Sequence, residues 1–216
     1  MGKLFVGILG GFSGTVGTVI GSCNRKGEDI IRVKSNKTRT SNTQGQVSQR
    51  TRFGLVTGFM QPLNPLLKFG FKMVAGTQMS PYNYACKYTL NKAMAGTEAQ
   101  PELDYSKIII SDGGLSRISG ATAIKEGDNI KFSWSEMVGN GIGTADDKVA
   151  LLVYNVTNGE ISHSMGDVLR SAKIATLPMP YNESDDQLLF YLFFQSASDP
   201  LQVSTSQYLG TVTVSE

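Results

Sequence analysis

The chain offers few side chains that could do chemistry, and their spacing decides which reactions are open to it. His163 is the only histidine, which excludes a site built from two histidines. Serine and aspartate residues are present, but the nucleophile-elbow spacing that would support a catalytic triad is missing. The acidic pairs Asp146-Asp147 and Asp185-Asp186 lack the spacing of a calcium loop, which favours solvated acidic turns. The sequence therefore predicts a protein that is not an enzyme and that uses no cofactor and no metal.

Basic residues form the second group with a chemical meaning. Eight of them fall between residues 25 and 52, against two acidic residues. Six are candidate interaction residues or structural anchors: Arg25, Lys26, Arg32, Lys34, Arg50 and Arg52. Clustered Lys and Arg side chains bind phosphates, so a nucleic-acid partner is one interpretation. No recognised reading helix accompanies the cluster, and a face that is solvated or paired with carboxylates is the other interpretation.

The net charge of +2 hides an asymmetry between the halves of the chain. Residues 1–106 hold 13 Lys and Arg against 5 Asp and Glu, whereas residues 107–216 hold 7 against 13. Such a split indicates two modules. The halves could attract each other, within or between chains, or the basic half could meet an anionic partner. We expect a protein partner or self-association, with nucleic acid and glycan as alternative partners.

Two cysteines, Cys23 and Cys86, are too few for a disulfide framework in 216 residues. The run Ile20-Gly21-Ser22-Cys23 resembles a bacterial lipoprotein cleavage site, but glycines interrupt the apolar segment before it. We predict a cytoplasmic chain, with a lipoprotein anchored at Cys23 as the alternative. No stretch is long and apolar enough to span a membrane.

A helix in the stretch from residue 39 to residue 71 must position Arg50 and Arg52. Ser41 or Thr43 can cap its start, with a glutamine three residues on to complete a capping box. Apolar residues at spacings of three and four give it one buried face: Phe53, Val56, Met60 and Leu63. Pro62 and Pro65 end or kink it.

The two arginines of this helix point about 200 degrees apart. Arg50 precedes Phe53 by three residues and is therefore close to the predicted buried face. We predict that Arg50 lays its stem along apolar surface and ties the helix to a Gly-rich hairpin, while Arg52 is the more solvated of the two.

The elements on either side of this helix are also marked by their sequence. Residues 10–34 read as a Gly-rich β-hairpin, in which residues 16–20 alternate as in a strand, residues 24–27 give a turn and residues 29–34 give a second strand. A further helix starts at Ser80-Pro81, an N-cap followed by proline at the first helical position, and Gly96 marks its end. We expect its tyrosines, Tyr82, Tyr84 and Tyr88, to pack in the core or against helices rather than to form an aromatic binding platform.

Beyond residue 104 the apolar pattern changes to period two. The predicted strands are residues 107–110, 130–134, 149–156, 159–164, 168–176, 188–194 and 208–214. The sequence predicts a mainly β (α+β) fold, with a Gly-rich β-hairpin and two or three helices followed by a fibronectin-III/immunoglobulin-like antiparallel β-sandwich. Trp134, Tyr154 and Tyr191 are expected in the sandwich core. The predicted domains are residues 1–104, which are basic, and residues 105–216, which are acidic.

Several short motifs resemble those of an uncharacterised Bacteroidetes family of unknown function. They are Gly10-Gly11-Phe12-Ser13-Gly14, residues 16–22, Gly27, Ile31-Arg32, Gln49-Arg50-x-Arg52-Phe53, Gly70-Phe71, Tyr84, residues 90–93 and residues 104–107. The resemblance covers most of the chain and implies no activity. The opening hairpin, together with the Gln-x-x-Arg motif that follows it, also looks like the openings of phage and prophage proteins.

We therefore expect a non-enzymatic structural or interaction protein, part of an assembly derived from a mobile element. A cell-surface ligand- or glycan-binding, adhesin-like protein is the first alternative. A nucleic-acid-binding protein that uses the basic N-terminal half is the second.

Overall fold

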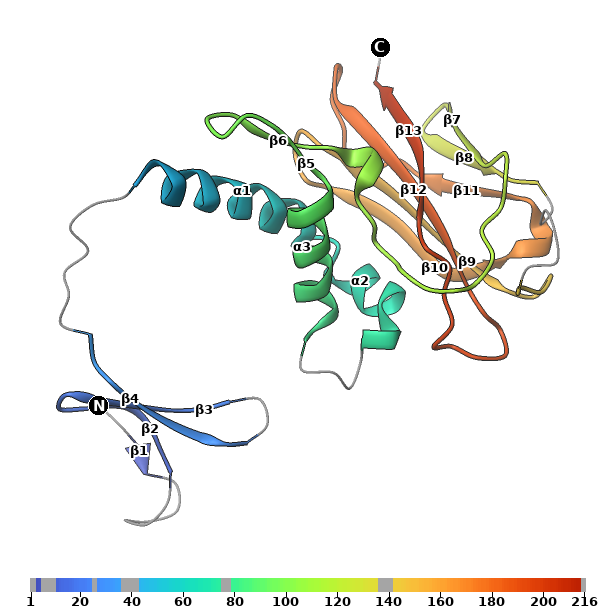
Figure 1. Ribbon diagram of the computed structural model, residues 1–216. Helices are drawn as coiled ribbons and strands as arrows, with labels where there is room; N and C mark the ends of the chain where they lie inside the picture. Colours follow the sequence, from blue (N-terminus) through green and yellow to red (C-terminus); the bar gives the residue numbers. More distant parts are fainter. Residues whose placement is uncertain are drawn as a thin grey trace. The chain divides into compact units, whose positions relative to one another are not determined.

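The structure is a computed structural model that describes residues 3–4, 11–24, 27–35, 43–74, 79–135 and 142–214 (Figure 1). The chain divides into two compact units, residues 1–43 and residues 44–216, which we call the N-terminal unit and the main unit. Each unit is described by itself. This division differs from the boundary near residue 104 that the sequence suggested, because the helices that follow residue 43 share a core with the sheets that follow residue 104.

The N-terminal unit is a four-stranded antiparallel sheet in the order β1-β2-β3-β4. Its strands are β1 (Lys3–Leu4), β2 (Phe12–Val16), β3 (Val19–Cys23) and β4 (Asp29–Val33). The sequence predicted one hairpin over residues 10–34, but a tight turn at Gly17 divides its first half into two strands. Gly17 has φ +58, a value that favours glycine. The predicted pairing of residues 29–34 is confirmed, since β3 pairs with β4 from Val19↔Val33 to Cys23↔Asp29.

Three helices open the described part of the main unit, and their ends follow the sequence signals. They are α1 (Gln44–Met60), α2 (Asn64–Gly70) and α3 (Pro81–Lys92), with a short 3-10 helix, η2 (Lys72–Val74), between the last two. α1 ends before Pro62, and Pro65 lies in the first turn of α2. Ser80 caps α3 as predicted, since its Oγ accepts a hydrogen bond from the Asn83 amide at 3.2 Å. None of the helices in the described residues is both long and apolar enough to cross a membrane.

A small hairpin occupies the stretch that the sequence assigned to a domain boundary. β5 (Met94–Gly96) pairs with β6 (Pro101–Leu103), and Gly96 adopts φ +76 at the turn. Gly96 therefore does not end α3, which stops at Lys92; it turns the chain back so that β6 can contact α1.

The rest of the main unit is a stack of two antiparallel sheets. The first has the order β10-β9-β12-β13 and the second the order β11-β8-β7. Their strands are β7 (Thr122–Glu126), β8 (Asn129–Ser133), β9 (Lys148–Asn155), β10 (Ile161–Leu169), β11 (Ile174–Pro178), β12 (Gln187–Gln195) and β13 (Gln207–Thr213). The 3-10 helix η3 (Tyr105–Lys107) precedes β7, and a second one, η4 (Arg170–Ala172), separates β10 from β11. The predicted mainly β, α+β class is confirmed. The immunoglobulin and fibronectin likeness stays a prediction.

Strands β9 and β12 are buried on both faces, because the four-stranded sheet is the middle layer of three. One face of this sheet packs against the helices, through Leu152, Tyr191 and Phe193 on the sheet side and Val56 on α1. The other face packs against the three-stranded sheet. Figure 1 shows this order of helices, four-stranded sheet and three-stranded sheet. A central strand covered on both sides explains the uninterrupted apolar run at residues 188–194.

Trp134 lies in the core between the two sheets, as predicted, with 4% of its surface exposed. Its indole Nε1 donates a hydrogen bond to the Arg170 carbonyl at 2.8 Å. Its ring meets Phe194 edge-on, at 6.4 Å between centroids. Tyr154 and Tyr191 are also buried, but in the core beneath the helices rather than between the sheets.

Two predicted strands are wrong. Residues 168–176 do not form one strand, because η4 bends the chain so that it leaves the four-stranded sheet with β10 and enters the three-stranded sheet with β11. Residues 107–110 begin in η3 and continue as a buried segment outside the strands.

That buried segment is held by serines near the C-terminal strand. The Ile110 amide donates to Ser206 Oγ at 2.9 Å, and Ser111 Oγ donates to the Ser204 carbonyl at 2.7 Å. The Ser206 amide donates in return to the Ser111 carbonyl at 3.2 Å. These bonds satisfy buried backbone groups that would otherwise be costly, and we call this set of contacts the serine clip.

Candidate functional site

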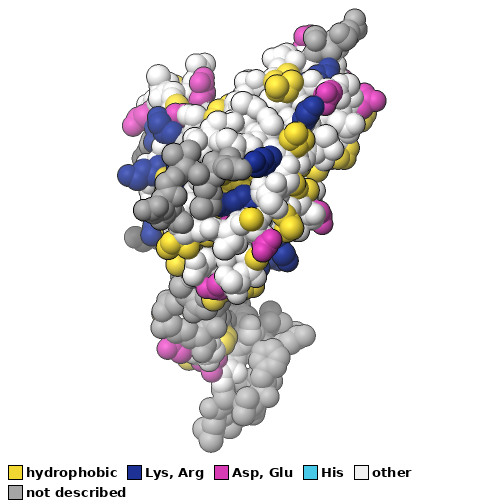
Figure 2. Space-filling model, turned by 90° about the vertical axis from the view of Figure 1, so that its right-hand side faces the viewer, with side chains coloured by type: hydrophobic (Ala, Val, Ile, Leu, Met, Phe, Trp, Pro, Cys, Tyr) yellow, Lys and Arg dark blue, Asp and Glu magenta, His cyan; other side chains and the backbone are white. Residues whose placement is uncertain are grey.

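The six basic residues singled out by sequence do not form one described cluster. Arg25 and Lys26 lie outside the described residues. Arg32 is an exposed residue of β4, with Lys34 exposed just beyond it, whereas Arg50 and Arg52 are on α1 in the other unit. Arg32 and Lys34 are therefore considered within the N-terminal unit, and Arg50 and Arg52 within the main unit. On the face of the molecule drawn in Figure 2, Lys and Arg side chains are dispersed among other side chains.

The two arginines of α1 are arranged opposite to the prediction. Arg50 is exposed, and Arg52 is half-buried, with an Nε atom that is inaccessible to solvent and has no hydrogen-bond partner among the described residues. The buried face of α1 runs through Ser48, Arg52 and Val56, whereas Phe53 is 55% exposed. Phe53 therefore did not mark the buried face, which continues from Val56 to Phe59 and Met60.

The N-terminal unit presents an apolar sheet face. Val16, Val19 and Val33 lie side by side across β2, β3 and β4 in the strand register. Ile31 shares this face, because residues two apart on a strand point the same way. Phe12 adds to it and packs over Gly21, where a Cβ would overlap the phenylalanine ring. Ile31 and Val33 are 67% and 78% exposed.

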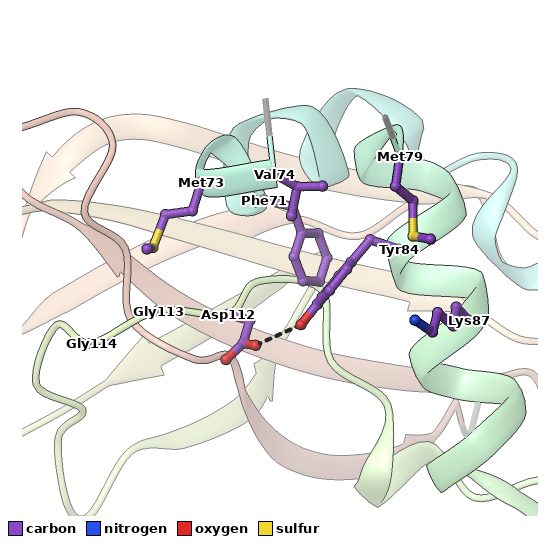
Figure 3. Close-up of a pocket in the computed structure, with 9 residues that line it drawn as sticks. All are labelled: Phe71, Met73, Val74, Met79, Tyr84, Lys87, Asp112, Gly113 and Gly114. Carbon is purple, nitrogen blue, oxygen red and sulfur yellow. Dashed lines mark hydrogen bonds between the residues drawn. The ribbon is translucent and has the colours of Figure 1, made fainter. Parts of the chain in front are cut away.

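A pocket of about 450 Å³ lies in the main unit between the helices and the loop that follows the buried segment. Its lining residues are Phe71, Met73, Val74, Met79, Tyr84, Lys87, Asp112, Gly113 and Gly114. We call it the Tyr84 pocket. Figure 3 shows Tyr84 reaching from α3 toward Asp112, with Met73 and Met79 on either side. The walls are mostly apolar, and the polar groups are one carboxylate, one phenol and one ammonium.

Close backbone packing shapes this pocket. A Cβ on Gly70 would overlap the Ile110 carbonyl, and a Cβ on Gly113 would overlap the Val203 carbonyl. Both glycines let the loop at residues 110–114 come close to its neighbours, which brings Asp112 opposite α3. The Phe71 and Tyr84 rings contact each other with centroids 5.2 Å apart and planes inclined by 55°.

Asp112 is held from two sides. Its Oδ2 accepts a hydrogen bond from the Tyr84 hydroxyl at 3.2 Å, and its Oδ1 accepts one from Thr205 Oγ1 at 3.3 Å. Burial and then the Asp112 carboxylate raise the pKa of Tyr84, so the phenol remains a neutral donor. Among the described residues, no Lys, Arg or His forms an ion pair with Asp112.

A second pocket of about 450 Å³ contains Arg170, but this arginine serves the fold. Its Nε lies 3.5 Å from Asp147 Oδ2, an Nη atom donates to the Ser116 carbonyl at 2.9 Å, and its guanidinium stacks 4.0 Å from the Phe194 ring centroid. Burial lowers the pKa of Arg170, and Asp147 opposes this shift. This buried pair joins η4 to the loop before β9.

The remaining candidate groups are dispersed in the described residues. His163 lies on β10 opposite Leu152. Asp186 accepts hydrogen bonds from Asn155 Nδ2 at 2.7 Å and from the Glu183 amide at 2.9 Å, as part of a loop. Cys23 and Cys86 are free thiols. In the described ranges, no three His, Cys, Asp or Glu side chains are grouped closely enough to hold a metal ion.

Sequence reasoning missed the Tyr84 pocket, whose polar pair is 28 residues apart along the chain. It gave Tyr84 a packing role, which its contact with Phe71 supports in part. The available signal was Asp112-Gly113-Gly114, an acidic residue beside two glycines directly after a buried apolar run.

Comparison with known proteins gives one family. Residues 11–210 match the model of a family described as a family of unknown function, DUF6266. A search of curated proteins returns no match to this chain. The resemblance to an uncharacterised family is thus confirmed, while the Bacteroidetes origin and the likeness to phage proteins stay predictions.

Proposed function

Since the chain belongs to DUF6266, a family of unknown function, we propose from its geometry that it is a non-catalytic structural protein that assembles with further copies of itself. The observation that supports this proposal most is the apolar face of the N-terminal sheet. Proteins that act as monomers rarely leave such faces open to water.

The size of the N-terminal unit makes this face significant. A unit of 43 residues is close to the length below which chains cannot usually build a sufficient core alone. Fully burying one Val or Ile side chain contributes roughly 1.5–3 kcal/mol. If a partner covered Ile31 and Val33, their burial would therefore contribute most of two such increments. The edge of β4 could add backbone hydrogen bonds.

The distribution of charge favours a second copy of the chain as this partner. Residues 1–43 hold 7 Lys and Arg against 2 Asp and Glu, whereas residues 44–216 hold 13 against 16. Opposite net charges favour contact between the N-terminal unit of one copy and the main unit of another. Such head-to-tail contacts form rings or filaments, which suits a structural role.

Sedimentation velocity of the full chain over a range of concentrations tests this proposal. We expect oligomers that dissociate when Ile31 and Val33 are both changed to serine and that weaken as salt screens the charges. Ile30→Ser is the matched control, because Ile30 is an exposed isoleucine on the opposite face of β4. A wild-type chain that stays monomeric at every concentration would overturn the proposal, and so would equal behaviour of the two variants.

Cross-linking of mixed isotope-labelled and unlabelled chains identifies which copy supplies each surface. Links between labelled and unlabelled chains that join residues 1–43 to residues 44–216 support the head-to-tail arrangement. Links confined to single chains would show that the N-terminal sheet covers its own main unit, and would contradict the assembly.

A ligand-binding role at the cell surface is the second candidate, and the Tyr84 pocket favours it. Fractionation of the host cells tests the surface location, which requires export. Gene neighbourhood tests the mobile-element origin of the assembly. Titration with DNA and RNA at two salt concentrations tests the nucleic-acid alternative, which requires binding that weakens steeply with salt.

A further inference from the structure

The Tyr84 pocket combines an apolar body with one carboxylate that is already oriented. We propose that it binds a small organic amine, whose ammonium pairs with Asp112 and whose apolar part contacts Val74 and the two methionines, Met73 and Met79. This inference is independent of the proposed self-assembly, because it rests on a pocket of the main unit and the self-assembly rests on the apolar face of the N-terminal sheet.

The volume and lining of the pocket fit a small molecule. A space of about 450 Å³ is within the range of ligand pockets, which are mostly apolar with a few placed polar groups. Phe71 is fully buried at its base, so the pocket has a rigid wall. Met73 and Met79 have flexible, polarizable side chains that adapt to different apolar shapes.

Asp112 supplies the specificity for a cation. The two hydrogen bonds that its carboxylate accepts from described side chains come from neutral hydroxyl groups, those of Tyr84 and Thr205, so they orient the carboxylate without neutralising it. An ionised carboxylate offers about four acceptor positions, which leaves room for an ammonium donor. The adjacent Tyr84 ring adds a face that attracts cations.

Lys87 is the other charge at the pocket, and it makes the proposal testable. It is an exposed residue of α3, so water and salt screen its repulsion of a bound ammonium, whereas Asp112 is half-buried. If the ligand were an anion, Lys87 would attract it and Asp112 would repel it. The two readings therefore predict opposite effects of the same substitutions.

Three probes of one skeleton separate the readings: benzylamine, benzyl alcohol and phenylacetate. Binding to the full chain is measured by NMR titration at neutral pH and low salt. We expect benzylamine to bind with residue-specific shifts at Tyr84 and Asp112, and phenylacetate to bind on the order of tenfold more weakly. Benzyl alcohol should fall between them.

Substitutions of the two charged residues then test which of them attracts the ligand. Asp112→Asn keeps an acceptor oxygen for one of the two hydroxyl groups of Tyr84 and Thr205 and places an amide nitrogen, a donor, toward the other. It should weaken benzylamine binding on the order of tenfold. Lys87→Ala changes an exposed side chain and should tighten benzylamine binding about twofold. Asp128→Asn is the control, since it makes the same charge change at an exposed turn outside the pocket lining.

Four outcomes would overturn the proposal. They are the absence of benzylamine binding up to its solubility limit, preference for phenylacetate, unchanged benzylamine affinity in Asp112→Asn, and weaker benzylamine binding in Lys87→Ala. If Asp112→Asn fails to fold, the comparison of probes on the wild-type chain and on Lys87→Ala still decides the sign of the ligand charge.

Discussion

Trp134 allows a direct test of the sandwich core. Trp134→Ala removes the largest side chain between the two sheets, together with its edge contact to Phe194 and its hydrogen bond to the Arg170 carbonyl. Trp134→Phe keeps a ring in the space and removes chiefly the hydrogen bond. The backbone bond from the Trp134 amide to the Lys173 carbonyl, at 3.0 Å, remains in both variants.

The expected magnitudes follow from these contacts. Removing a buried tryptophan side chain costs about 3–5 kcal/mol, because the lost transfer free energy adds to the cost of the cavity. In Trp134→Phe the Arg170 carbonyl retains the longer bond from the Lys173 amide at 3.4 Å. Weakening the hydrogen bonding of one buried carbonyl, with a small loss of packing, should cost about 1–2 kcal/mol. Native stabilities are about 5–15 kcal/mol, so the alanine variant should be strongly destabilised.

The assay is urea unfolding followed by far-ultraviolet circular dichroism, since both variants lack the only tryptophan of the chain. In the wild-type protein, indole fluorescence should be blue-shifted and protected from acrylamide quenching. A Trp134→Ala variant within about 1 kcal/mol of the wild type, or an indole quenched as readily as free tryptophan, would refute the reasoning.

Three further predictions concern charged and titrating groups of the main unit. Asp147→Ala should lower the free energy of unfolding by about 3–5 kcal/mol in urea titrations, because it removes the carboxylate that faces the buried Arg170 cation. The exposed neighbour Asp146 should tolerate alanine within about 0.5 kcal/mol, and equal effects of the two substitutions would argue against the pair. Burial raises the pKa of Tyr154 from 10.0 to about 12, so the folded state favours the neutral phenol. The contribution of Tyr154 to the free energy of unfolding is therefore complete below pH 10. It falls by roughly 2–3 kcal/mol as the pH rises from 10 toward 12. Tyr154→Phe should therefore lose less stability over that range, and a loss as large as that of the wild type would rule the assignment out. Arg52→Met should leave the thermal midpoint unchanged or raise it. The substitution removes an Nε atom that has no hydrogen-bond partner among the described residues, and it keeps the aliphatic part of the side chain. A marked decrease in the midpoint would show that the guanidinium stabilises the fold.

The strands that sequence reasoning placed well are those with strong period-two patterns. Ile130 and Phe132 on β8 and the apolar run of β12 have inward residues that are large and apolar. β7 was missed because its inward positions are Ala123 and Lys125, while Ile124 points outward. The helix and strand patterns thus predicted the class, but not the membership of every sheet.

Charged residues in buried positions account for other differences between the predicted and the observed structure. Arg170 is buried at the bend between β10 and β11, and its alternating neighbours looked like one continuous strand. Arg52 lies on the buried side of α1, although it was predicted to be the more solvated of the two arginines, and Phe53 lies exposed beside it. Arginine is usually exposed and phenylalanine usually buried, but in both cases the tertiary contacts of the fold outweigh this preference.

The Tyr84 pocket could not be predicted, because its parts come from separate segments that only the folded chain brings together. α3 itself was predicted from Ser80-Pro81, and so was the packing role of Tyr84. The position of Asp112 depends on the loop that Gly70 and Gly113 let approach its neighbours. The apolar face of the N-terminal sheet was only partly visible, since the turn at Gly17 was read as part of a strand.

The serine clip has a consequence for the order in which the nascent chain can fold. Its bonds join residues that are 96 and 93 positions apart along the chain. Helices α1 and α3 rely on local contacts and can begin to form early on the ribosome. Ile110 and Ser111, which follow them, lack their partners in the serine clip until residues 204 and 206 have emerged. β12 is one of the two strands that are buried on both faces, and it also emerges late. The main unit should therefore acquire protease resistance in one late step after most of it has been translated, rather than domain by domain during synthesis.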